Sequence, residues 1–494
     1  MRGRLGSGAL VWAGFDGSTV PGPLLDAIER GRIGGLLLFA FRGNVRSRDQ
    51  VRAMLREAVA AAARGGLPPV PVAVDQEGGS VVRIGYGAVF PSAMAIAATG
   101  DPDNAERVAR ATAIGLRADG IAVNHAPVCD VNVEPRNPVI GTRAFGDDAT
   151  RVAAFASAWV RGSEGAGVAT TPKHFPGHGA TALDSHHTTI DVRADRAELE
   201  RRELVPFRAA FAAGASGAMT AHVRYPALDD ERIATLSPRI LGALLRDELG
   251  FGGLAMTDSL DMAGVTQVET PERVAATAVE AGIDAVMVTS GLDRQLDAAE
   301  RIALGVTPKR LLEAIGRATA FRARFGIAVP DDGADDGAGR ALAIEVATAA
   351  ITRTGPPLPP LPPDGLRVAL FPPTRRSPVE ELARPEAHLE RALRARFGDR
   401  VTVSNDGVAP PGEGLLAVCT SNACFDREQA ERARALLAEG GILCALRSPY
   451  DAAVLPDRPA LLTYGDVPAS LEALAEVLSG RTVPRGTLPV RLPT

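Results

Sequence analysis

Short apolar runs alternate with longer stretches rich in Ala, Arg and Glu along the N-terminal part of the chain. The runs consist mainly of Val, Ile, Leu and Ala, whereas the stretches between them repeat apolar positions at helical spacing. This alternation predicts strands that each lead into a helix, the arrangement of a parallel sheet. We count eight such runs, at residues 8–15, 33–39, 70–75, 121–131, 168–174, 218–223, 254–258 and 284–288.

The eight predicted strands favour a closed (β/α)8 barrel over an open doubly wound sheet. Each run is apolar throughout, as expected for parallel strands that are buried on both faces. A barrel gathers the carboxyl ends of its strands around one mouth, where active sites form. Polar residues cluster at these strand ends: Asp75, Glu77, Asp130, Asn132, Lys173, His174, His222 and Asp258.

Two breaks separate the predicted barrel from the rest of the chain. Residues 331–339 are acidic and glycine-rich, and residues 355–365 contain six prolines, which predicts a stiff, extended spacer. Residues 340–353, between the two breaks, have a helical pattern. We therefore expect a barrel domain over residues 1–330, a linker over residues 331–365 and a smaller C-terminal α/β sandwich domain over residues 366–494.

The second domain shows its own alternation of apolar runs and helical stretches. Its predicted strands lie at residues 368–371, 415–419, 442–446 and 460–463, and its predicted helices at residues 426–438 and 470–478. The whole chain is therefore predicted to belong to the α/β class.

Composition narrows the classes of protein that fit this pattern. The chain has 494 residues, a formal net charge of −5 and 46% hydrophobic residues. The slightly acidic balance argues against nucleic-acid binding, which depends on Lys and Arg neutralising phosphates. No apolar run reaches the ~18 residues that a membrane-spanning helix needs. We expect neither a nucleic-acid nor a membrane partner.

The N-terminus and the cysteines bear on localisation. Residues 9–15 form a short apolar stretch behind two arginines, which could imitate a signal peptide, but Gly14 interrupts it and no small-residue cleavage site follows. We interpret it as the first buried strand. The four cysteines are irregularly spaced and form no CxxC pair, so neither a disulfide framework nor zinc binding is indicated. A cytoplasmic protein with reduced thiols is expected.

Histidines concentrate in one part of the sequence. Six of the seven lie between residues 125 and 222, and four of them between residues 174 and 187. This density beside a predicted strand end favours a functional role. A metal site is one alternative, but Pro176 and Gly177 exclude the helix that would place His174 and His178 on one face.

Asp184 and His186 are candidates for a pair that transfers protons. In an extended loop, residues i and i+2 project on the same side, so the carboxylate can accept a hydrogen bond from one ring nitrogen while the other faces the substrate. Such a partner fixes the tautomer and allows the imidazole to donate and recover a proton near neutral pH.

Asp258 is the candidate nucleophile, because it ends an otherwise apolar strand at the expected barrel mouth. A buried carboxylate needs nearby cations to stay ionised, and Lys173, Arg143 and Arg83 are candidates for that role. The alternative is a structural role as the N-cap of the following helix, which a neighbouring Ser or Asp could equally fill.

Five motifs follow one another through the predicted barrel: VDQEGGSVVR (74–83), NPVIGTRAFGDD (137–148), KHFPGHGATALDSH (173–186), AMTAHVRYPALD (218–229) and AMTDSLDMAG (255–264). Together they resemble glycoside hydrolase family 3, in the subgroup of β-N-acetylhexosaminidases that recycle peptidoglycan. The segment GRTVPRGTLPVRLP (480–493) resembles the end of the C-terminal α/β sandwich domain of that family.

The resemblance implies a retaining β-N-acetylhexosaminidase of the EC 3.2.1.52 type. In this reaction Asp258 attacks the anomeric carbon, and His186, oriented by Asp184, protonates the leaving oxygen. Glycines at positions 177 and 179 agree with a mobile loop that delivers the histidine when substrate is bound. No metal or other cofactor is implied. The residues that the resemblance assigns to sugar binding are Asp75, Arg83, Arg143, Lys173 and His174, with His222 near the same mouth, while Glu77 and Asp130 brace neighbouring side chains.

The expected substrate is a small carbohydrate, either a muropeptide that contains N-acetylglucosamine or a chito-oligosaccharide. The aromatic content of 4% favours a short exo-acting pocket over a long stacking groove. Two positions depart from the family's pattern: Ala180 stands where Asp is common, and His187 directly follows the Asp184–His186 pair.

Four alternatives stay open. Because a neutral imidazole does not repel an anionic acceptor, phosphate could replace water in the second step, although hydrolysis is the expected main reaction. The others are a family 3 β-glucosidase whose acid/base carboxylate comes from the C-terminal domain, a metal-dependent barrel hydrolase and a non-catalytic sugar-binding protein.

Overall fold

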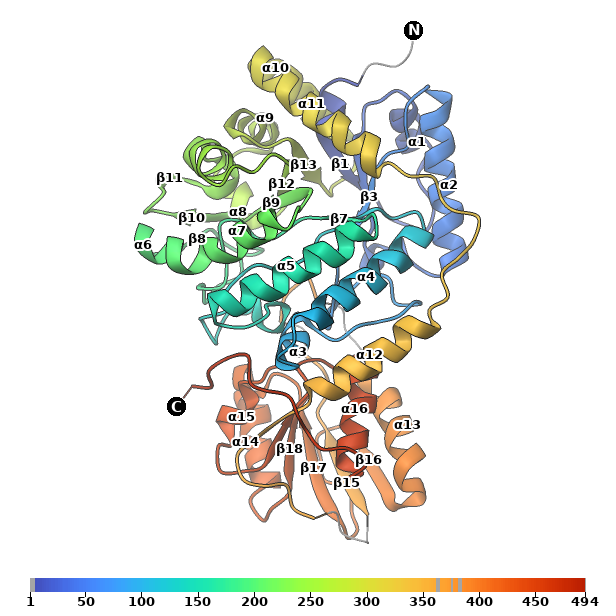
Figure 1. The fold of residues 1–494 in the computed structure, drawn as a ribbon, viewed down its shortest axis with the longest axis vertical. Helices are drawn as coiled ribbons and strands as arrows, with labels where there is room; N and C mark the ends of the chain where they lie inside the picture. The colour runs from blue at the N-terminus through green and yellow to red at the C-terminus, as the bar shows by residue number, and fades with distance from the viewer. Residues whose placement is uncertain (1–4, 361–364, 375, 381–383, 494) are drawn as a thin grey trace.

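The computed structural model describes residues 5–360, 365–374, 376–380 and 384–493. Its larger part is a ring of eight parallel strands surrounded by helices (Figure 1). Around the ring the strands follow the order β7, β6, β3, β2, β1, β13, β12 and β9. Their bounds are Val11–Gly14 for β1, Gly35–Leu37 for β2, Val72–Val74 for β3, Val123–Asn124 for β6, Ala169–Thr170 for β7, Gly217–Thr220 for β9, Leu254–Ser259 for β12 and Ala285–Val288 for β13.

Backbone hydrogen bonds of Phe175 connect the two ends of this order, β7 and β9. The amide of Phe175 donates to the carbonyl of Met219 at 2.8 Å, and the amide of Ala221 donates to the carbonyl of Phe175 at 2.8 Å. The sheet is thus a nearly closed barrel. Each of its strands lies within or overlaps one of the eight predicted runs, so the predicted fold class is confirmed.

Helices cover the outside of the barrel and connect successive strands. Their starts follow local capping chemistry: Ser47 and Asp148 accept hydrogen bonds from the third amide beyond them, at the first turns of α2 and α5. The helices that follow the eight barrel strands are α1 (Gly22–Glu29), α2 (Arg48–Arg64), α4 (Asp103–Ala118), α5 (Ala149–Gly165), α7 (Leu204–Ala212), the helix Arg239–Glu248, α9 (Pro271–Ala281) and α10 (Leu292–Gly305), with α11 (Pro308–Phe325) behind α10.

Two barrel strands are much shorter than predicted. The runs at 121–131 and 168–174 contribute only two ladder residues each, in β6 and β7. Pro127 and Pro172 follow these strands, and proline has no amide hydrogen to continue a ladder. The remainder of each run therefore forms loops at the barrel mouth.

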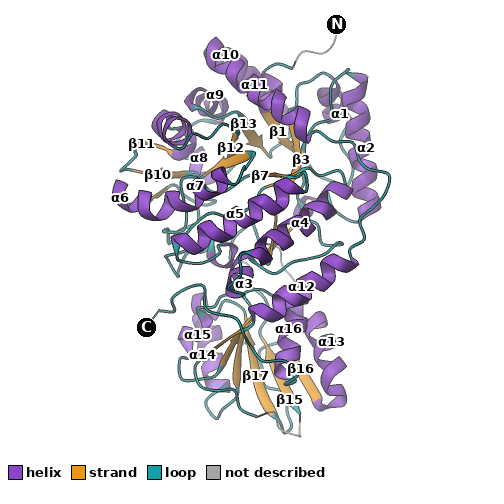
Figure 2. Cartoon of the chain, viewed as in Figure 1, coloured by secondary structure: helices purple, strands orange, loops and turns teal. Residues whose placement is uncertain are grey.

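The smaller part of the molecule contains a six-stranded sheet with helices on both faces. Figure 2 shows its strands between α14 and α15 on one side and α13 and α16 on the other. The strand order is β14, β19, β18, β17, β15 and β16, and only β14 is antiparallel to its neighbour. The strands are β14 (Thr352–Thr354), β15 (Leu366–Leu370), β16 (Val401–Ser404), β17 (Leu415–Thr420), β18 (Ile442–Ala445) and β19 (Ala460–Leu462), and the helices are α13 (Pro385–Phe397), α14 (Arg427–Leu436), α15 (Asp451–Val454) and α16 (Pro468–Leu478).

The two edge strands, β14 and β16, are absent from the sequence-based prediction. Both are short and only partly buried, so they lack the continuous apolar run of a central strand. β14 lies inside the predicted linker, together with α12 (Gly337–Ala350), and pairs with β19. Residues 361–364 of the proline-rich spacer lie outside the described residues.

The second domain packs against loops of the barrel, and α12 runs between the two parts (Figure 1). Ser92 donates to the carbonyl of Tyr464 at 2.7 Å, and the amide side chain of Asn132 donates to the hydroxyl of Tyr450 at 3.1 Å. Both barrel residues belong to loops that follow strands, so the second domain lies beside the mouth. In the described part of the chain, no helix is both long and apolar enough to cross a membrane.

Candidate active site

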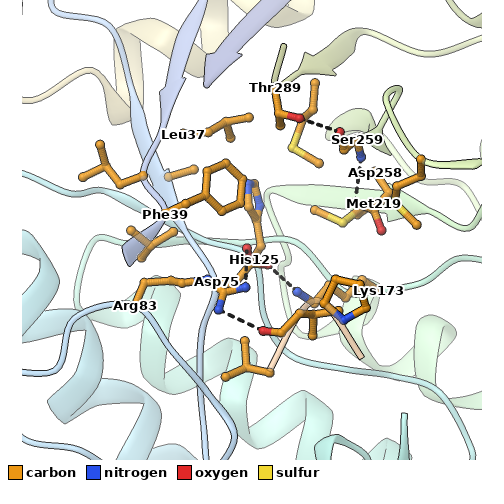
Figure 3. A pocket seen from close by; sticks show the side chains of 18 of the residues that line it. Leu37, Phe39, Asp75, Arg83, His125, Lys173, Met219, Asp258, Ser259 and Thr289 are labelled. Carbon is orange, nitrogen blue, oxygen red and sulfur yellow. Dashed lines mark hydrogen bonds and ion pairs between the residues drawn. The ribbon is translucent and has the colours of Figure 1, made fainter. Parts of the chain in front are cut away.

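A cavity of about 320 Å³ opens at the carboxyl ends of the barrel strands. Figure 3 shows side chains from several strands that converge on it, with Asp75, Arg83 and Lys173 on one side and Asp258 on another. Seven of the nine residues predicted for the site line the cavity: Asp75, Arg83, Arg143, Lys173, His174, His186 and Asp258. The barrel thus brings together residues that lie far apart in the sequence.

A buried cluster of opposite charges forms one side of the cavity. The ammonium group of Lys173 lies 2.7 Å from Asp75 and 2.6 Å from Glu77. The guanidinium of Arg143 makes two hydrogen bonds to Glu77, at 2.8 and 2.9 Å, and Arg83 lies 4.0 Å from Asp75. Strong hydrogen-bonded pairs of this kind hold both carboxylates in fixed orientations.

The cations of this cluster keep its carboxylates ionised. Burial raises the pKa of Asp75, but Lys173 and Arg83 outweigh it and hold that pKa well below the usual range. Burial also raises the pKa of Glu77, yet Arg143 and Lys173 lower it to about 2. Both groups therefore carry their negative charge at neutral pH.

Asp258 has different neighbours from those that the sequence predicts. Lys173, Arg143 and Arg83 were expected to keep it ionised, but the structure pairs them with Asp75 and Glu77. Burial raises the pKa of Asp258, but three imidazoles and the hydrogen bond from the amide of Ser259 together lower it by a larger amount, so its pKa lies below the ordinary value. These imidazoles belong to His174, His222 and His186.

The alternative structural role for Asp258 does not fit its position. Asp258 lies on β12, and its carboxylate accepts a hydrogen bond from the amide of Ser259 at 2.7 Å. The next helix, α8 (Ala263–Thr266), begins several residues later, behind Met262. Asp258 is therefore a strand residue at the mouth and not the N-cap of that helix.

Asp184 and His186 form a hydrogen-bonded pair at the rim of the cavity. One oxygen of Asp184 accepts from the backbone amide of His186 at 2.8 Å and from its Nδ1 at 2.6 Å. The other oxygen accepts from the hydroxyl of Ser377 at 2.8 Å. Burial raises the pKa of Asp184, but the hydrogen bonds and charge of His186 lower it below its usual range.

The loop that carries this pair is not extended as predicted. The amide of His187 donates to the carbonyl of Asp184 at 3.1 Å, so residues 184–187 form a turn. The two side chains still meet, because the Asp184 carboxylate accepts hydrogen bonds from both the amide and the ring of His186. Asp side chains in turns often bond the backbone amide two residues on. The ring bonded to Asp184 belongs to His186 and not to the adjacent His187.

His174 is held by Asp130, which is completely buried. The Nδ1 of His174 donates to Asp130 at 2.7 Å, and the amides of His174 and His178 donate to the other oxygen, at 3.2 and 2.6 Å. This arrangement fixes the tautomer and leaves Nε2 of His174 for the cavity. Thr181 and Ser185 bond both ring nitrogens of His178, so that residue shapes the loop.

His222 does not line the cavity. Its Nδ1 lies 2.8 Å from the hydroxyl of Thr235, and its Nε2 lies 3.0 Å from the carbonyl of Ser259. Both ring nitrogens are thus engaged within the protein, and the side chain supports the strand that carries Asp258. Asp184 is the other predicted residue outside the lining, since it lies behind His186.

His125 is a lining residue that the sequence analysis did not assign. Its Nδ1 lies 3.0 Å from the hydroxyl of Thr171, while its buried Nε2 has no hydrogen-bond partner among the described residues. Burial lowers the pKa of its imidazole to about 4. The sequence could have indicated this role, because His125 lies in the fourth apolar run, where other polar residues mark the predicted barrel mouth.

The residues that the structure describes contain no cluster of three or more His, Cys, Asp or Glu suited to a metal ion.

Comparisons of sequence agree with this geometry. The profile of the Glycosyl hydrolase family 3 N terminal domain matches residues 24–314. A Beta-hexosaminidase from Stenotrophomonas maltophilia is 40% identical over 289 residues, which cover 56% of this chain and 83% of that protein. Beta-hexosaminidase A from Pseudoalteromonas piscicida is 38% identical over 299 residues, which cover 57% of this chain but only 50% of that protein.

Comparisons of structure extend the likeness to both domains. A glycoside hydrolase family 3 beta-N-acetylglucosaminidase from Paenibacillus sp. str. FPU-7 superimposes with a TM-score of 0.91 at 34% identity, over 98% of each chain. A Beta-N-acetylhexosaminidase from Beutenbergia cavernae superimposes with a TM-score of 0.57 at 32% identity, over 64% of this chain and 97% of that one. With these matches and the predicted motifs in place around one cavity, the chain belongs to glycoside hydrolase family 3.

Proposed function

We propose that this protein is a retaining exo-β-N-acetylglucosaminidase that removes terminal N-acetylglucosamine from peptidoglycan-derived fragments in the cytoplasm. The observation that carries the proposal is the presence of Asp258 and the Asp184-bound His186 on the same cavity. A carboxylate nucleophile and a proton donor are the two groups that retaining glycoside hydrolysis requires. The relatives named Beta-hexosaminidase and beta-N-acetylglucosaminidase support an N-acetylhexosaminide as the sugar that is released.

In the first step, a carboxylate oxygen of Asp258 attacks the anomeric carbon and the bond to the leaving oxygen breaks. The Nε2–H of a protonated His186 gives its proton to that oxygen, so the aglycone leaves as a neutral alcohol. Asp184 stabilises the imidazolium because its carboxylate accepts from Nδ1. The product is a glycosyl ester on Asp258.

In the second step, water attacks the same carbon from the face that the aglycone has left. The Nε2 of His186, now neutral, removes a proton from this water, and the ester bond to Asp258 breaks. Two inversions give net retention. Asp184 holds one tautomer of the imidazole throughout, so a single nitrogen serves as acid and then as base.

The buried charge cluster holds the sugar. Asp75 can accept hydrogen bonds from hydroxyl groups, and Lys173 and His174 can donate to them. Arg143 contributes through Glu77, because its guanidinium bonds that carboxylate and the carbonyl of Val139. A cavity of about 320 Å³ lies near the lower end of the ~300–1,000 Å³ range of small-molecule sites, which favours a single terminal sugar.

Two of the alternatives make different predictions about the same cavity. A β-glucosidase mechanism needs an acidic side chain from the second domain, but the described residues that this domain places on the cavity are Pro378 and Val379. Phosphorolysis differs in the second step, where phosphate replaces water. A Beta-glucoside phosphorylase named BglX shares the fold at 21% identity.

Aryl N-acetylglucosaminides with good and poor leaving groups test the proposal. Asp258→Ala should abolish turnover of both. His186→Ala should lower kcat/KM for a phenyl glycoside by about 10²–10⁴-fold and far less for a dinitrophenyl glycoside, which needs little protonation. His187→Ala is the matched control and should retain the activity of the parent on both.

Two further measurements identify the nucleophile of the first step and the acceptor of the second. Mass spectrometry of enzyme treated with a slow fluorinated N-acetylglucosaminide should find the sugar on Asp258, and a label elsewhere would refute the proposed nucleophile. Addition of phosphate should leave free N-acetylglucosamine as the product, whereas formation of the sugar 1-phosphate would identify a phosphorylase.

A further inference from the structure

The second domain reaches the barrel mouth through residues 376–380, between β15 and α13. Three hydrogen bonds join this segment to different mouth loops. Arg376 donates to the carbonyl of Asn137 at 2.6 Å, Ser377 donates to Asp184 at 2.8 Å, and Arg83 donates to the carbonyl of Val379 at 2.9 Å.

We infer that Ser377 is a positioning residue for the Asp184–His186 pair, so that the second domain completes the acid/base apparatus of the barrel. This inference rests on the function proposed above. The Ser377 hydroxyl supplies the hydrogen bond to one oxygen of Asp184, while His186 occupies the other oxygen with its amide and its ring. Both ends of the carboxylate are thereby fixed.

Burial makes the Ser377 contact difficult to replace. Ser377 is 2% exposed and Asp184 is 7% exposed, so water has little access to their hydrogen bond. A carboxylate oxygen that loses its donor in such surroundings must turn toward another partner or become protonated. Either change disturbs the imidazole of His186, because Asp184 sets its tautomer and orientation.

Arg376 supports the same loop by a second route. Its guanidinium stacks on the ring of Phe425, 3.4 Å from the centroid, and donates to the carbonyl of Asn137. The amide side chain of Asn137 in turn donates to the carbonyl of His178, at the start of the loop that carries the pair. The segment thus holds the loop at its start and at the Asp184 carboxylate itself.

The test compares Ser377→Ala with the parent enzyme on the phenyl and dinitrophenyl N-acetylglucosaminides. We expect kcat/KM for the phenyl glycoside to fall about tenfold, which is less than the loss expected when the general acid itself is removed. For the dinitrophenyl glycoside, kcat/KM should change less than about twofold, because its first step needs little protonation. Ser377→Cys, which keeps the volume with a weaker donor, should lie between the two. Thr374→Val is the matched control, since its hydroxyl donates to the carbonyl of Ser421 within the second domain.

A double-mutant cycle with His186→Ala distinguishes positioning from a general structural effect. Once the imidazole is absent, Ser377→Ala should cause no further loss on the phenyl glycoside. The inference is overturned if Ser377→Ala and Ser377→Cys affect both glycosides equally or neither, or if their losses persist without His186. If His186→Ala itself shows no preference for the poor leaving group, the proposed function fails, and the inference fails with it for that separate reason.

Discussion

Glu77→Gln removes one negative charge from the buried cluster and leaves its shape nearly unchanged. Glu77 is 4% exposed and accepts two hydrogen bonds from Arg143 as well as the ion pair with Lys173 at 2.6 Å. In the variant, the amide NH₂ would face these donors in place of a carboxylate oxygen. Lys173 and Arg143, the two cations that bond Glu77, would then have Asp75 as the one carboxylate left in the cluster.

The expected loss of stability can be worked out in two ways. The pKa of Glu77 lies at about 2 and its ordinary value at 4.5. At about 1.4 kcal/mol for each pKa unit, this displacement corresponds to roughly 3 kcal/mol of folding free energy at pH 7. Removal of one partner from a buried ion pair costs about 3–5 kcal/mol, which agrees with the first figure.

The loss should also depend on pH, with a defined sign. Because folding lowers the pKa of Glu77, its contribution is fully present above pH 4.5 and disappears as the pH falls from there toward 2. The difference between parent and variant should therefore be about 1 kcal/mol smaller at pH 4 than at pH 7. If the substitution disturbed only packing, the loss of stability would be the same at both pH values.

Urea unfolding followed by tryptophan fluorescence measures this difference without screening the charges by salt. Trp12 and Trp159, the two tryptophans of the chain, lie on β1 and α5, so the signal reports on the barrel. Glu345→Gln is the matched control. Glu345 also makes two hydrogen bonds to an arginine, Arg107, but at the surface, where such pairs contribute less than about 1 kcal/mol. Equal losses for the two variants would refute the reasoning, as would a Glu77→Gln loss that stays constant with pH.

Three other substitutions separate stability from catalysis. Asp284→Asn removes the completely buried carboxylate that bonds three arginines at the amino end of β13, so urea unfolding should show a loss of about 3–5 kcal/mol while kcat/KM of the folded enzyme stays unchanged. Gly177→Ala introduces a Cβ 2.7 Å from Glu203 at a φ of +134°, and differential scanning calorimetry should show a loss of about 1–3 kcal/mol. Asp130→Asn leaves one acceptor oxygen where two oxygens serve the Nδ1 of His174 and the amides of His174 and His178, so kcat/KM on the dinitrophenyl glycoside should fall about tenfold or more. An unchanged value would exclude a role for that imidazole in binding.

The barrel could be predicted from the sequence because its determinants are local. Each strand is a run of apolar residues, and the helix that follows it has its own period and capping residues, as at Ser47. Strand ends then place Asp75, Lys173 and Asp258 around one mouth without any knowledge of side-chain contacts. Ladder lengths were overestimated most where Pro127 and Pro172 end the pairing.

The partners of each site residue could not be predicted, because they depend on packing across the mouth. Nothing in the sequence near Lys173 shows that its ammonium lies against Asp75 and Glu77, and an assignment to Asp258 was equally compatible with strand order. The contact of Ser377 with Asp184 joins positions 193 residues apart and depends on how the second domain docks. His125 was missed because an apolar run conceals a single polar residue.

The structure divides the charges of the site into two groups with different chemistry. Arginine and lysine stay charged at any relevant pH, and they bond Asp75 and Glu77. In the proposed reaction Asp75 holds hydroxyl groups and Glu77 braces Arg143 and Lys173, so neither carboxylate has to lose its charge. The pKa of Asp258 is instead lowered mainly by the imidazoles of His174, His222 and His186. A permanent cation bonded to Asp258 would oppose the loss of negative charge that accompanies ester formation, whereas imidazoles keep the carboxylate ionised and can themselves change charge. The placement of histidines around Asp258, and of stronger cations elsewhere, therefore suits a carboxylate that must alternate between anion and ester.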